Sequence, residues 1–225
     1  MEPDRGSASG QGSAVTVMTM SGRRQPGPAS IHSLQVVLEG TDPPVWRRLL
    51  VRSHTPLAEL HEILQRAMGW WDCHLHQFRV GPATYAPSQP GGYGPRPKDE
   101  SRARLAAVAP TGTRFVYEYD FGDGWEHTIN VEKVMPATDG HVYPCCVGGA
   151  QACPPEDCGG WWGYAELVNT LKSGSDEQRD EMIEWLGGDY DPDHFDLAGV
   201  NAALSPLGGK AGQRRGKRTA MVTNT

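Results

Sequence analysis

The stretch that decides the fold is FVYEYDFGDGWEHTINV, residues 115–131. Apolar side chains alternate with polar ones over residues 115–119 and again over residues 125–131, which is the two-residue period of a β-strand with one buried face. Between the two runs, residues 121–124 read Phe-Gly-Asp-Gly, and aspartate beside glycine is typical of a tight turn. The stretch therefore predicts a β-hairpin.

Segments on the N-terminal side of this hairpin extend the predicted sheet. Residues 34–38 and 45–51 form a second pair of apolar runs, joined by the turn sequence Gly-Thr-Asp-Pro-Pro. A short strand over residues 73–80 would place His74 and His76 on the same face. The Gly- and Pro-rich residues 81–104 show no regular pattern and are expected to form a loop. These segments predict a mixed or antiparallel sheet of hairpins.

Helix signals occur after the first hairpin and again in the last third of the chain. Thr55 is a suitable N-cap, Pro56 fits the first helical position, and apolar residues recur at three- and four-residue spacing until Gly69. Three further helices are expected at residues 164–172, residues 176–186 after the cap residue Ser175, and residues 196–204 with Asp196 as N-cap. Strands followed by helices predict an α+β fold with several helices packed on the sheet.

The composition is that of a globular protein. The 225 residues are 38% hydrophobic and include seven Trp, which suffices for a core in one domain over residues 31–206. Residues 1–30, rich in Ser, Gly and Pro, and the basic residues 207–225 are expected to be disordered. No run is long and apolar enough to span a membrane, and no secretion signal is evident. We expect a cytoplasmic protein with its five Cys as thiols.

Charge is distributed unevenly along the chain. Of the net charge of −6, residues 1–30 contribute +1 and residues 207–225 contribute +5, which leaves −12 for residues 31–206. Such an acidic domain repels phosphate, so nucleic-acid binding through the folded part is not expected. As an alternative, the basic residues 207–225 could bind nucleic acid weakly and non-specifically. The simpler interpretation is that this tail is a solvated chain end.

Polar residues gather at the tip of the predicted hairpin. They are Tyr119, Asp120, Asp123, Trp125 and His127. Carboxylates and an imidazole around a tight turn are suited to holding a cation or positioning a water. The alternative is structural, because Asp and Gly are ordinary turn residues and a histidine on an apolar strand face is commonly a core residue.

A cysteine-rich loop follows the hairpin. Zinc prefers four nitrogen or sulfur ligands, and Cys146, Cys153 and Cys158 could supply three of them, with the fourth from His74, His76 or His127. The spacing matches no standard zinc finger, so unligated thiols packed in a loop are the alternative.

Two acids lie in the same loop. Glu156 and Asp157 follow two prolines and precede Cys158 and two glycines, which indicates a rigid segment before a sharp turn. Acids held this way are candidate site residues. They are equally suited to stabilising the N-terminus of the helix that follows.

Four motifs in this order resemble one known family. They are Pro-Val-Trp-Arg-Arg at residues 44–48, His-Leu-His-Gln-Phe at 74–78, the hairpin tip at 119–127, and Cys-Pro-Pro-Glu-Asp-Cys-Gly-Gly at 153–160. Over residues 31–205 the chain resembles the plasmid pRi ORF-three-like family. The resemblance implies an α+β fold and an uncharacterised function. Some similar proteins are bacterial passenger genes of plasmids and insertion elements labelled resolvase-like (TnpR), yet this chain shows no recombinase constellation.

The leading functional hypothesis is a metal- or ligand-binding accessory protein associated with such mobile elements. Its site would gather two histidines of the predicted strand, the hairpin tip and the two loop acids, namely His74, His76, Tyr119, Asp120, Asp123, Trp125, His127, Glu156 and Asp157. The cofactor would be zinc or another divalent cation. The first alternative is a metal-dependent hydrolase in which Asp123 or Glu156 activates a metal-bound water. The second is a weakly DNA-associated protein acting through its basic tail.

Overall fold

The computed structural model describes residues 29–88 and 96–208. Eight strands form a single mixed sheet in the order β5-β4-β3-β6-β7-β1-β2-β8, in which only the β4–β5 pair is parallel. The strands are β1 (Ser30–Leu38), β2 (Trp46–Arg52), β3 (His76–Val80), β4 (Ala83–Ala86), β5 (Lys98–Asp99), β6 (Arg114–Tyr119), β7 (Trp125–Pro136) and β8 (Cys145–Ala150). The α+β prediction is confirmed.

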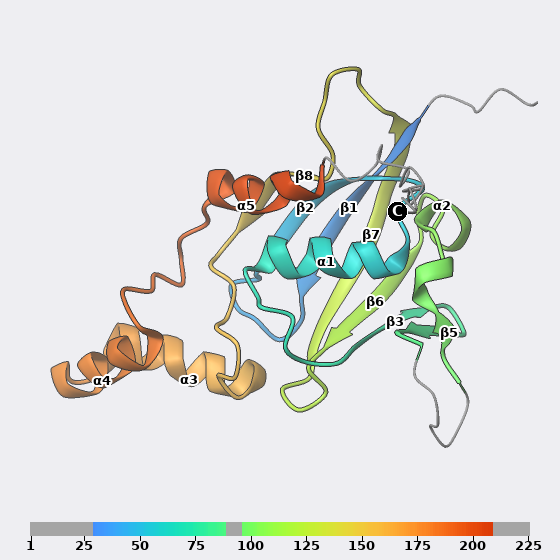
Figure 1. Cartoon of the computed structure of the whole chain (residues 1–225). Coiled ribbons are helices and arrows are strands. Elements are labelled where there is room, and N and C mark those ends of the chain that lie inside the picture. Colours follow the sequence, from blue (N-terminus) through green and yellow to red (C-terminus); the bar gives the residue numbers. More distant parts are fainter. Residues whose placement is uncertain (1–28, 89–95, 209–225) are drawn as a thin grey trace, which may run out of the picture.

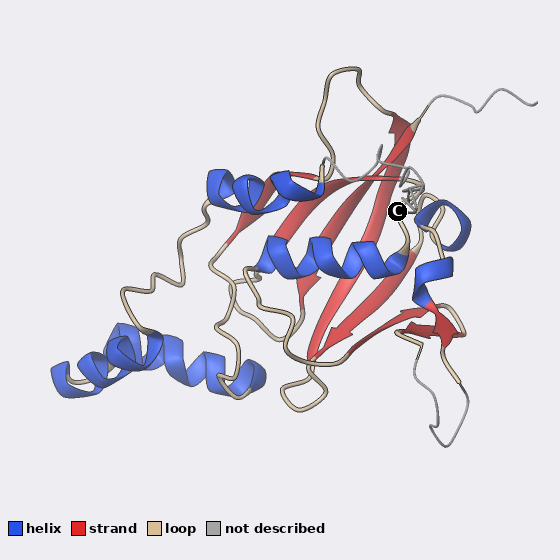
Figure 2. Ribbon diagram, viewed as in Figure 1, coloured by secondary structure: helices blue, strands red, loops and turns tan. Residues whose placement is uncertain are grey.

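The helices fall into two groups (Figure 1). Helix α1 (Leu57–Met68) lies across one face of the sheet, in contact with α5 (Leu197–Leu204), while α3 (Gly160–Ser173) and α4 (Asp176–Leu186) pack on each other away from that face. The short elements are η1 (Glu100–Arg102), α2 (Leu105–Val108) and η2 (Ser205–Leu207). Figure 2 shows the sheet with α1 on it and the α3–α4 pair joined to it by loops.

The core lies between α1 and the sheet. The apolar stripe of α1, including Leu60 and Leu64, is fully buried, as are the alternating residues Phe115 and Tyr117 of β6. Burial of this area is the main favourable term in folding. The side chains of the predicted hairpin therefore form the centre of the molecule, and its β6–β7 pairing runs from Arg114 opposite Asn130 to Tyr119 opposite Trp125.

Helix ends follow local sequence signals in the C-terminal part of the chain. The Ser175 side chain accepts from the Gln178 backbone N–H in a capping box, and Gly187, with φ of 73°, ends α4. Asp196 caps α5 by accepting from Gly199 N at 2.9 Å. At α1 the prediction was one residue off, because Pro56 rather than Thr55 is the N-cap.

Several predicted boundaries are wrong. The strand expected over residues 73–80 begins at His76, residues 81–104 contain β4, β5 and η1, and α3 begins at Gly160, before residue 164. The cysteine-rich loop contains strand β8, with Gly149 so close to Phe195 that an added Cβ would lie 2.6 Å from the ring. The sequence of this edge strand shows little alternation of apolar and polar residues, because glycines occupy positions where the chain packs too closely for a side chain.

The expected disorder of the termini falls largely on residues 1–28 and 209–225, outside the described residues. The described secondary structure extends one residue beyond the expected domain bounds at each end. Ser30 already belongs to β1, and Leu207 is buried in η2.

Candidate functional site

The loop between α1 and β3 organises the candidate site. Gly69, with φ of 85°, ends the helix and turns the chain. The next residue, Trp70, is buried, and its indole N–H donates to the carbonyl of Pro154 at 2.9 Å. Trp71 points outward and is 83% exposed. The loop thereby brings His74 and the Pro-Pro-Glu-Asp segment to the end of the β6–β7 hairpin.

One cluster of polar groups consists of His74, Asp120 and Asp157. Nε2 of His74 lies 3.1 Å from Oδ1 of Asp157 and 3.6 Å from Oδ2 of Asp120. Although these separations are short, Nε2 is buried and makes a hydrogen bond with neither carboxylate. The buried ring nitrogen therefore lies close to two carboxylates without a hydrogen bond to either.

Local turn chemistry holds the two carboxylates of this cluster. Asp120 has φ of 53° and Asp157 has φ of 58°, a region that aspartate tolerates better than most residues. Oδ1 of Asp120 accepts from the backbone N–H of Gly122 at 2.9 Å, which leaves Oδ2 directed towards His74. The hairpin turn thus positions one ligand atom, as expected from its Asp-Phe-Gly-Asp-Gly sequence.

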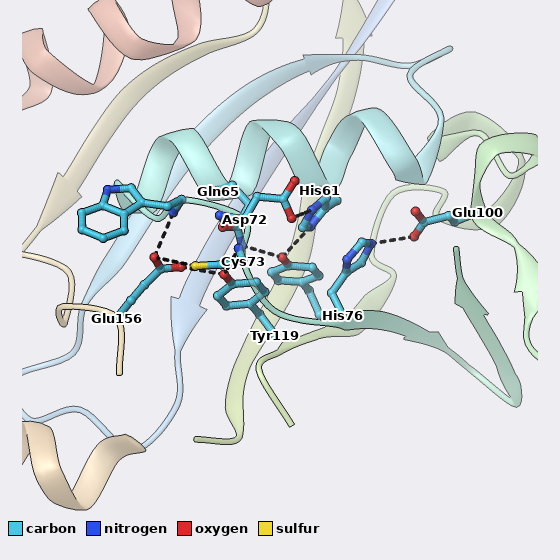
Figure 3. Close-up of polar contacts among 10 residues, drawn as sticks. His61, Gln65, Asp72, Cys73, His76, Glu100, Tyr119 and Glu156 are labelled. Carbon is cyan, nitrogen blue, oxygen red and sulfur yellow. Dashed lines mark hydrogen bonds and ion pairs between the residues drawn. The ribbon is translucent and has the colours of Figure 1, made fainter. Parts of the chain in front are cut away.

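Glu156 forms the second part of the site. It accepts from the Tyr119 hydroxyl at 2.6 Å and from the Trp71 backbone N–H at 3.2 Å, and Cys73 Sγ lies 3.4 Å from it. Burial of Tyr119, together with this hydrogen bond to a carboxylate, raises the pKa of the Tyr119 hydroxyl. Figure 3 shows Glu156 beside Cys73 and Tyr119.

A third part is a buried pair of stacked histidines. The rings of His61 and His76 are 3.5 Å apart at their centroids and inclined by only 6°. Nε2 of His76 contacts Glu100 at 2.9 Å, and Nε2 of His61 contacts Asp72 at 2.7 Å. Figure 3 shows the two rings between these acids.

Hydrogen bonds define the protonation of His61. Gln65 donates its amide to the Tyr117 hydroxyl at 2.9 Å, so the hydroxyl proton is directed to Nδ1 of His61 at 2.7 Å. Nε2 then carries the ring proton and donates it to Asp72. Burial, followed by the charge of the neighbouring His76, lowers the pKa of His61. His61 is therefore a neutral, fully bonded imidazole.

The structure places the site residues that were predicted from the sequence in different parts of the molecule. His74, Tyr119, Asp120, Glu156 and Asp157 meet at the end of the hairpin. His76 belongs to the buried stack instead, so the two histidines expected on one strand face serve different clusters. The cause is that residues 73–75 precede the strand, with Leu75 accepting from Asp120 N.

Three other nominated residues have structural roles. Asp123 accepts from Gly159 N at 3.2 Å and so joins the hairpin to the start of α3. Trp125 is buried against Trp70. His127 is fully buried, with its ring edge-on to Trp70 at 5.3 Å, and burial lowers its pKa to about 4. His127 is a neutral core residue away from the cluster.

The set Cys146, Cys153, Cys158 and His127, suggested as zinc ligands, is not assembled. Within the described residues, two groups of three or more metal-ligating atoms lie within 4.8 Å of one another, and neither contains a cysteine. Cys146 lies on β8, whereas Cys153 and Cys158 lie in the following loop. Burial raises the pKa of Cys153, and raises that of Cys158 to about 12, so both are protonated thiols at neutral pH.

The sequence analysis did not identify His61, Asp72 and Glu100 as members of the cluster around His76. His61 lies within the buried stripe of α1, and Glu100 lies in a segment expected to be a loop. The available signal was a histidine within an apolar helix stripe, because a buried imidazole requires hydrogen-bond partners.

Comparisons with known proteins agree on one relationship. The family model described as plasmid pRiA4b ORF-3-like protein matches residues 30–199. An uncharacterized protein of Sinorhizobium fredii, y4hQ, is 40% identical over 195 residues, covering 85% of this chain and 99% of the relative.

A solved structure supports the same relationship. The crystal structure of MM3350 from Methanosarcina mazei Go1, described as a protein of unknown function, matches with a TM-score of 0.69 and 34% identity, covering 75% of this chain and 96% of that one. Over the described residues, no helix is long and apolar enough to cross a membrane. The chain belongs to the plasmid pRiA4b ORF-3-like protein family.

Proposed function

We propose that the protein is an accessory domain that binds a divalent cation between His74, Asp120 and Asp157. The observation that carries this proposal is the buried Nε2 of His74, which lies 3.1 and 3.6 Å from two carboxylate oxygens without a hydrogen bond to either. The family model is named after an open reading frame of a plasmid, which supports an accessory role on plasmids.

The separations within the cluster suit a shared ion. Two ligand atoms that each lie about 2.1 Å from a metal are about 3.0 Å apart in octahedral and about 3.4 Å apart in tetrahedral coordination. Nε2 of His74 is 3.1 Å and 3.6 Å from its two carboxylate partners. Small side-chain adjustments would therefore bring all three atoms to an ion, and one imidazole with two carboxylates suits Zn²⁺ or Mn²⁺.

The second group of ligating residues, His61, Asp72 and His76, is less suitable. The lone pair of an imidazole nitrogen lies in the ring plane, and these two rings are nearly parallel and 3.5 Å apart. Their nitrogen lone pairs therefore do not converge on one point. Tyr117, Asp72 and Glu100 also occupy three of the ring nitrogens.

Three protein ligands leave coordination positions for water or a bound molecule, as in catalytic zinc sites. A hydrolase would in addition need an acid free to accept a proton from such a water. Asp123 and Glu156, the two acids nominated for that role, are engaged by Gly159 N and by Tyr119 and Trp71. Cation binding is thus the function that the geometry favours over hydrolysis.

The test is metal binding by the purified, untagged chain, measured by isothermal titration with Zn²⁺, Mn²⁺ and Mg²⁺ and by elemental analysis. The Asp120→Asn/Asp157→Asn variant removes both charges while asparagine tolerates the same backbone conformation. We expect one ion per wild-type chain and an affinity at least about a hundredfold weaker in the variant, since each of the two lost charged ligands removes more than about 1.4 kcal/mol.

The matched control is the His54→Ala/Asp139→Asn variant, which changes an exposed histidine and an exposed acid outside the cluster. It should bind the ion as the wild type does. Absence of a stoichiometric ion, or equal affinities for the wild type and the Asp120→Asn/Asp157→Asn variant, would contradict the proposal.

A further inference from the structure

A pocket of about 590 Å³ opens beside Glu156. Three segments line it: the end of α1 with the following loop, the Pro-Pro-Glu-Asp segment, and the end of α4 with the turn after it. Its volume is within the range of small-molecule sites. Segments that are distant in sequence thus enclose a space suitable for a ligand.

The walls of this pocket combine aromatic rings with acids. The residues that give it this character are Trp70, Trp71, Trp185, Glu156, Asp157 and Asp189. Among the described residues that line it, there is no Lys, Arg or His. Trp71 and Trp185 are 83% and 53% exposed, which is unusual for the largest aromatic side chain. An aromatic surface with net negative charge is complementary to an organic cation.

Backbone dipoles add to the negative potential. Helix α1 ends at Met68 and α4 ends at Leu186, and both C-terminal ends form part of the wall. The C-terminal end of a helix carries a partial negative charge that favours a cation nearby. Two helix termini therefore act in the same direction as the three carboxylates.

The carboxylate of Glu156 is held in place and lacks a charged partner. The Tyr119 hydroxyl and the Trp71 backbone N–H fix its orientation. Within residues 29–88 and 96–208, neither Glu156 nor Asp189 forms an ion pair. A preorganised carboxylate beside exposed indoles binds a cation with little cost of reorganisation.

We propose that this pocket binds an alkylammonium group carried on an apolar stem, with the charge at Glu156 and Asp189 and the stem against Trp71 and Trp185. The proposal goes beyond divalent-cation binding. The two sites share Asp157 as a wall, but the indoles, Glu156 and Asp189 belong to the pocket, whereas His74 and Asp120 belong to the ion cluster.

The test uses the full chain and four probes of similar length: spermidine, an acetylated and amidated Gly-Lys-Gly peptide, n-hexanol and hexanoate. Binding is measured by isothermal titration and by quenching of Trp fluorescence in low-salt buffer. We expect at least one cationic probe to bind and the neutral and anionic probes to bind at least about tenfold more weakly, consistent with a cation–π contact plus a charge-assisted bond.

The two cationic probes distinguish the source of the ligand. Preference for spermidine indicates a free polyamine, and preference for the peptide indicates a lysine side chain of a partner protein. Either preference supports the pocket. Binding of n-hexanol as tight as that of both cations, or no binding of either cation at millimolar concentration, would overturn the proposal.

Variants assign the binding to this pocket. Trp71→Ala and Trp185→Ala should each weaken the cationic probe about tenfold, and Asp189→Asn should weaken it several-fold. Trp162→Ala is the matched control, because Trp162 is an exposed indole on α3 outside the pocket. Equal weakening by Trp162→Ala would contradict the assignment.

The failure of this proposal is distinguishable from failure of the metal proposal. Trp71→Ala and Trp185→Ala should retain divalent-ion affinity, because neither residue belongs to the ion cluster. The His74→Ala variant should lose the ion and retain the cationic probe.

Discussion

His74 and His76 are two residues apart in the chain and lie in opposite environments. His76 is sealed beneath α1, where its ring stacks on His61 and its Nε2 contacts the buried Glu100. His74 lies at the rim of the site, where its Nε2 is 3.1 and 3.6 Å from two carboxylate oxygens and forms a hydrogen bond with neither. In the buried cluster of His61, His76 and their partners, Tyr117, Asp72 and Glu100 engage three of the four ring nitrogens, which suits a structural role. The open cluster retains unused ligand capacity, which suits binding.

The largest expected effect is a loss of stability in variants of the buried His61–His76 cluster, and it tests the structural role of that cluster. His61→Ala should lower the free energy of unfolding by about 4 kcal/mol, because it leaves a cavity and removes the acceptor of the buried Tyr117 hydroxyl. His74→Ala should cost less than about 1 kcal/mol, since that ring is partly exposed and unbonded. Urea denaturation of the two variants measures the difference, and equal losses would remove the distinction between the clusters.

The second-largest expected effect is a dependence of the free energy of unfolding on pH that arises from the buried His127. Burial lowers the pKa of His127 to about 4, against 6.5 for an unperturbed histidine. As the pH falls through 6.5 the unfolded chain binds a proton that the folded chain rejects until about pH 4, so stability is lost across this window. The loss attributable to His127 is about 3 kcal/mol.

The His127→Leu variant tests this assignment, because Nε2 of His127 has no hydrogen-bond partner and Nδ1 has only a long contact of 3.3 Å with the carbonyl of Tyr117. Its free energy of unfolding should decline less steeply than that of the wild type between pH 6.5 and pH 4. Burial also lowers the pKa of His32 and His61, so part of the decline should persist. A slope unchanged from the wild type would show that His127 does not titrate as its burial requires.

The smallest expected effect is on the stability of variants at Asp120, in the cluster of His74, Asp120 and Asp157. It separates the role of Asp120 in the turn from its role in ion binding. Asp120→Ala should cost about 1–2 kcal/mol, because alanine strains at φ of 53° and cannot accept from Gly122 N. Asp120→Asn retains both features and should change stability by less than about 0.5 kcal/mol. Thermal or urea denaturation without metal measures both, and a large loss in Asp120→Asn would assign the charge a structural role.

Local chemistry made part of this architecture predictable. The alternation in residues 115–131 predicted the β6–β7 hairpin, and Ser175 and Asp196 predicted their helix starts. Asp120 lies in the predicted turn, where its Oδ1 accepts from the backbone N–H of Gly122, and Glu156 lies in the predicted Pro-Pro-Glu-Asp loop. Strand β8 escaped prediction because Gly148 and Gly149 give it no side-chain alternation.

The sequence by itself determined the hairpins, the amphipathic α1 and the acids at the turns, because each depends on residues within a few positions of one another. Only the tertiary structure decided that His61 would stack on His76, that His127 would be sealed in the core, and that Glu156 would face the end of α4 across a pocket. These contacts join distant segments, and their partners are selected by the packing of α1 on the sheet. Local periodicity carries no information about that packing.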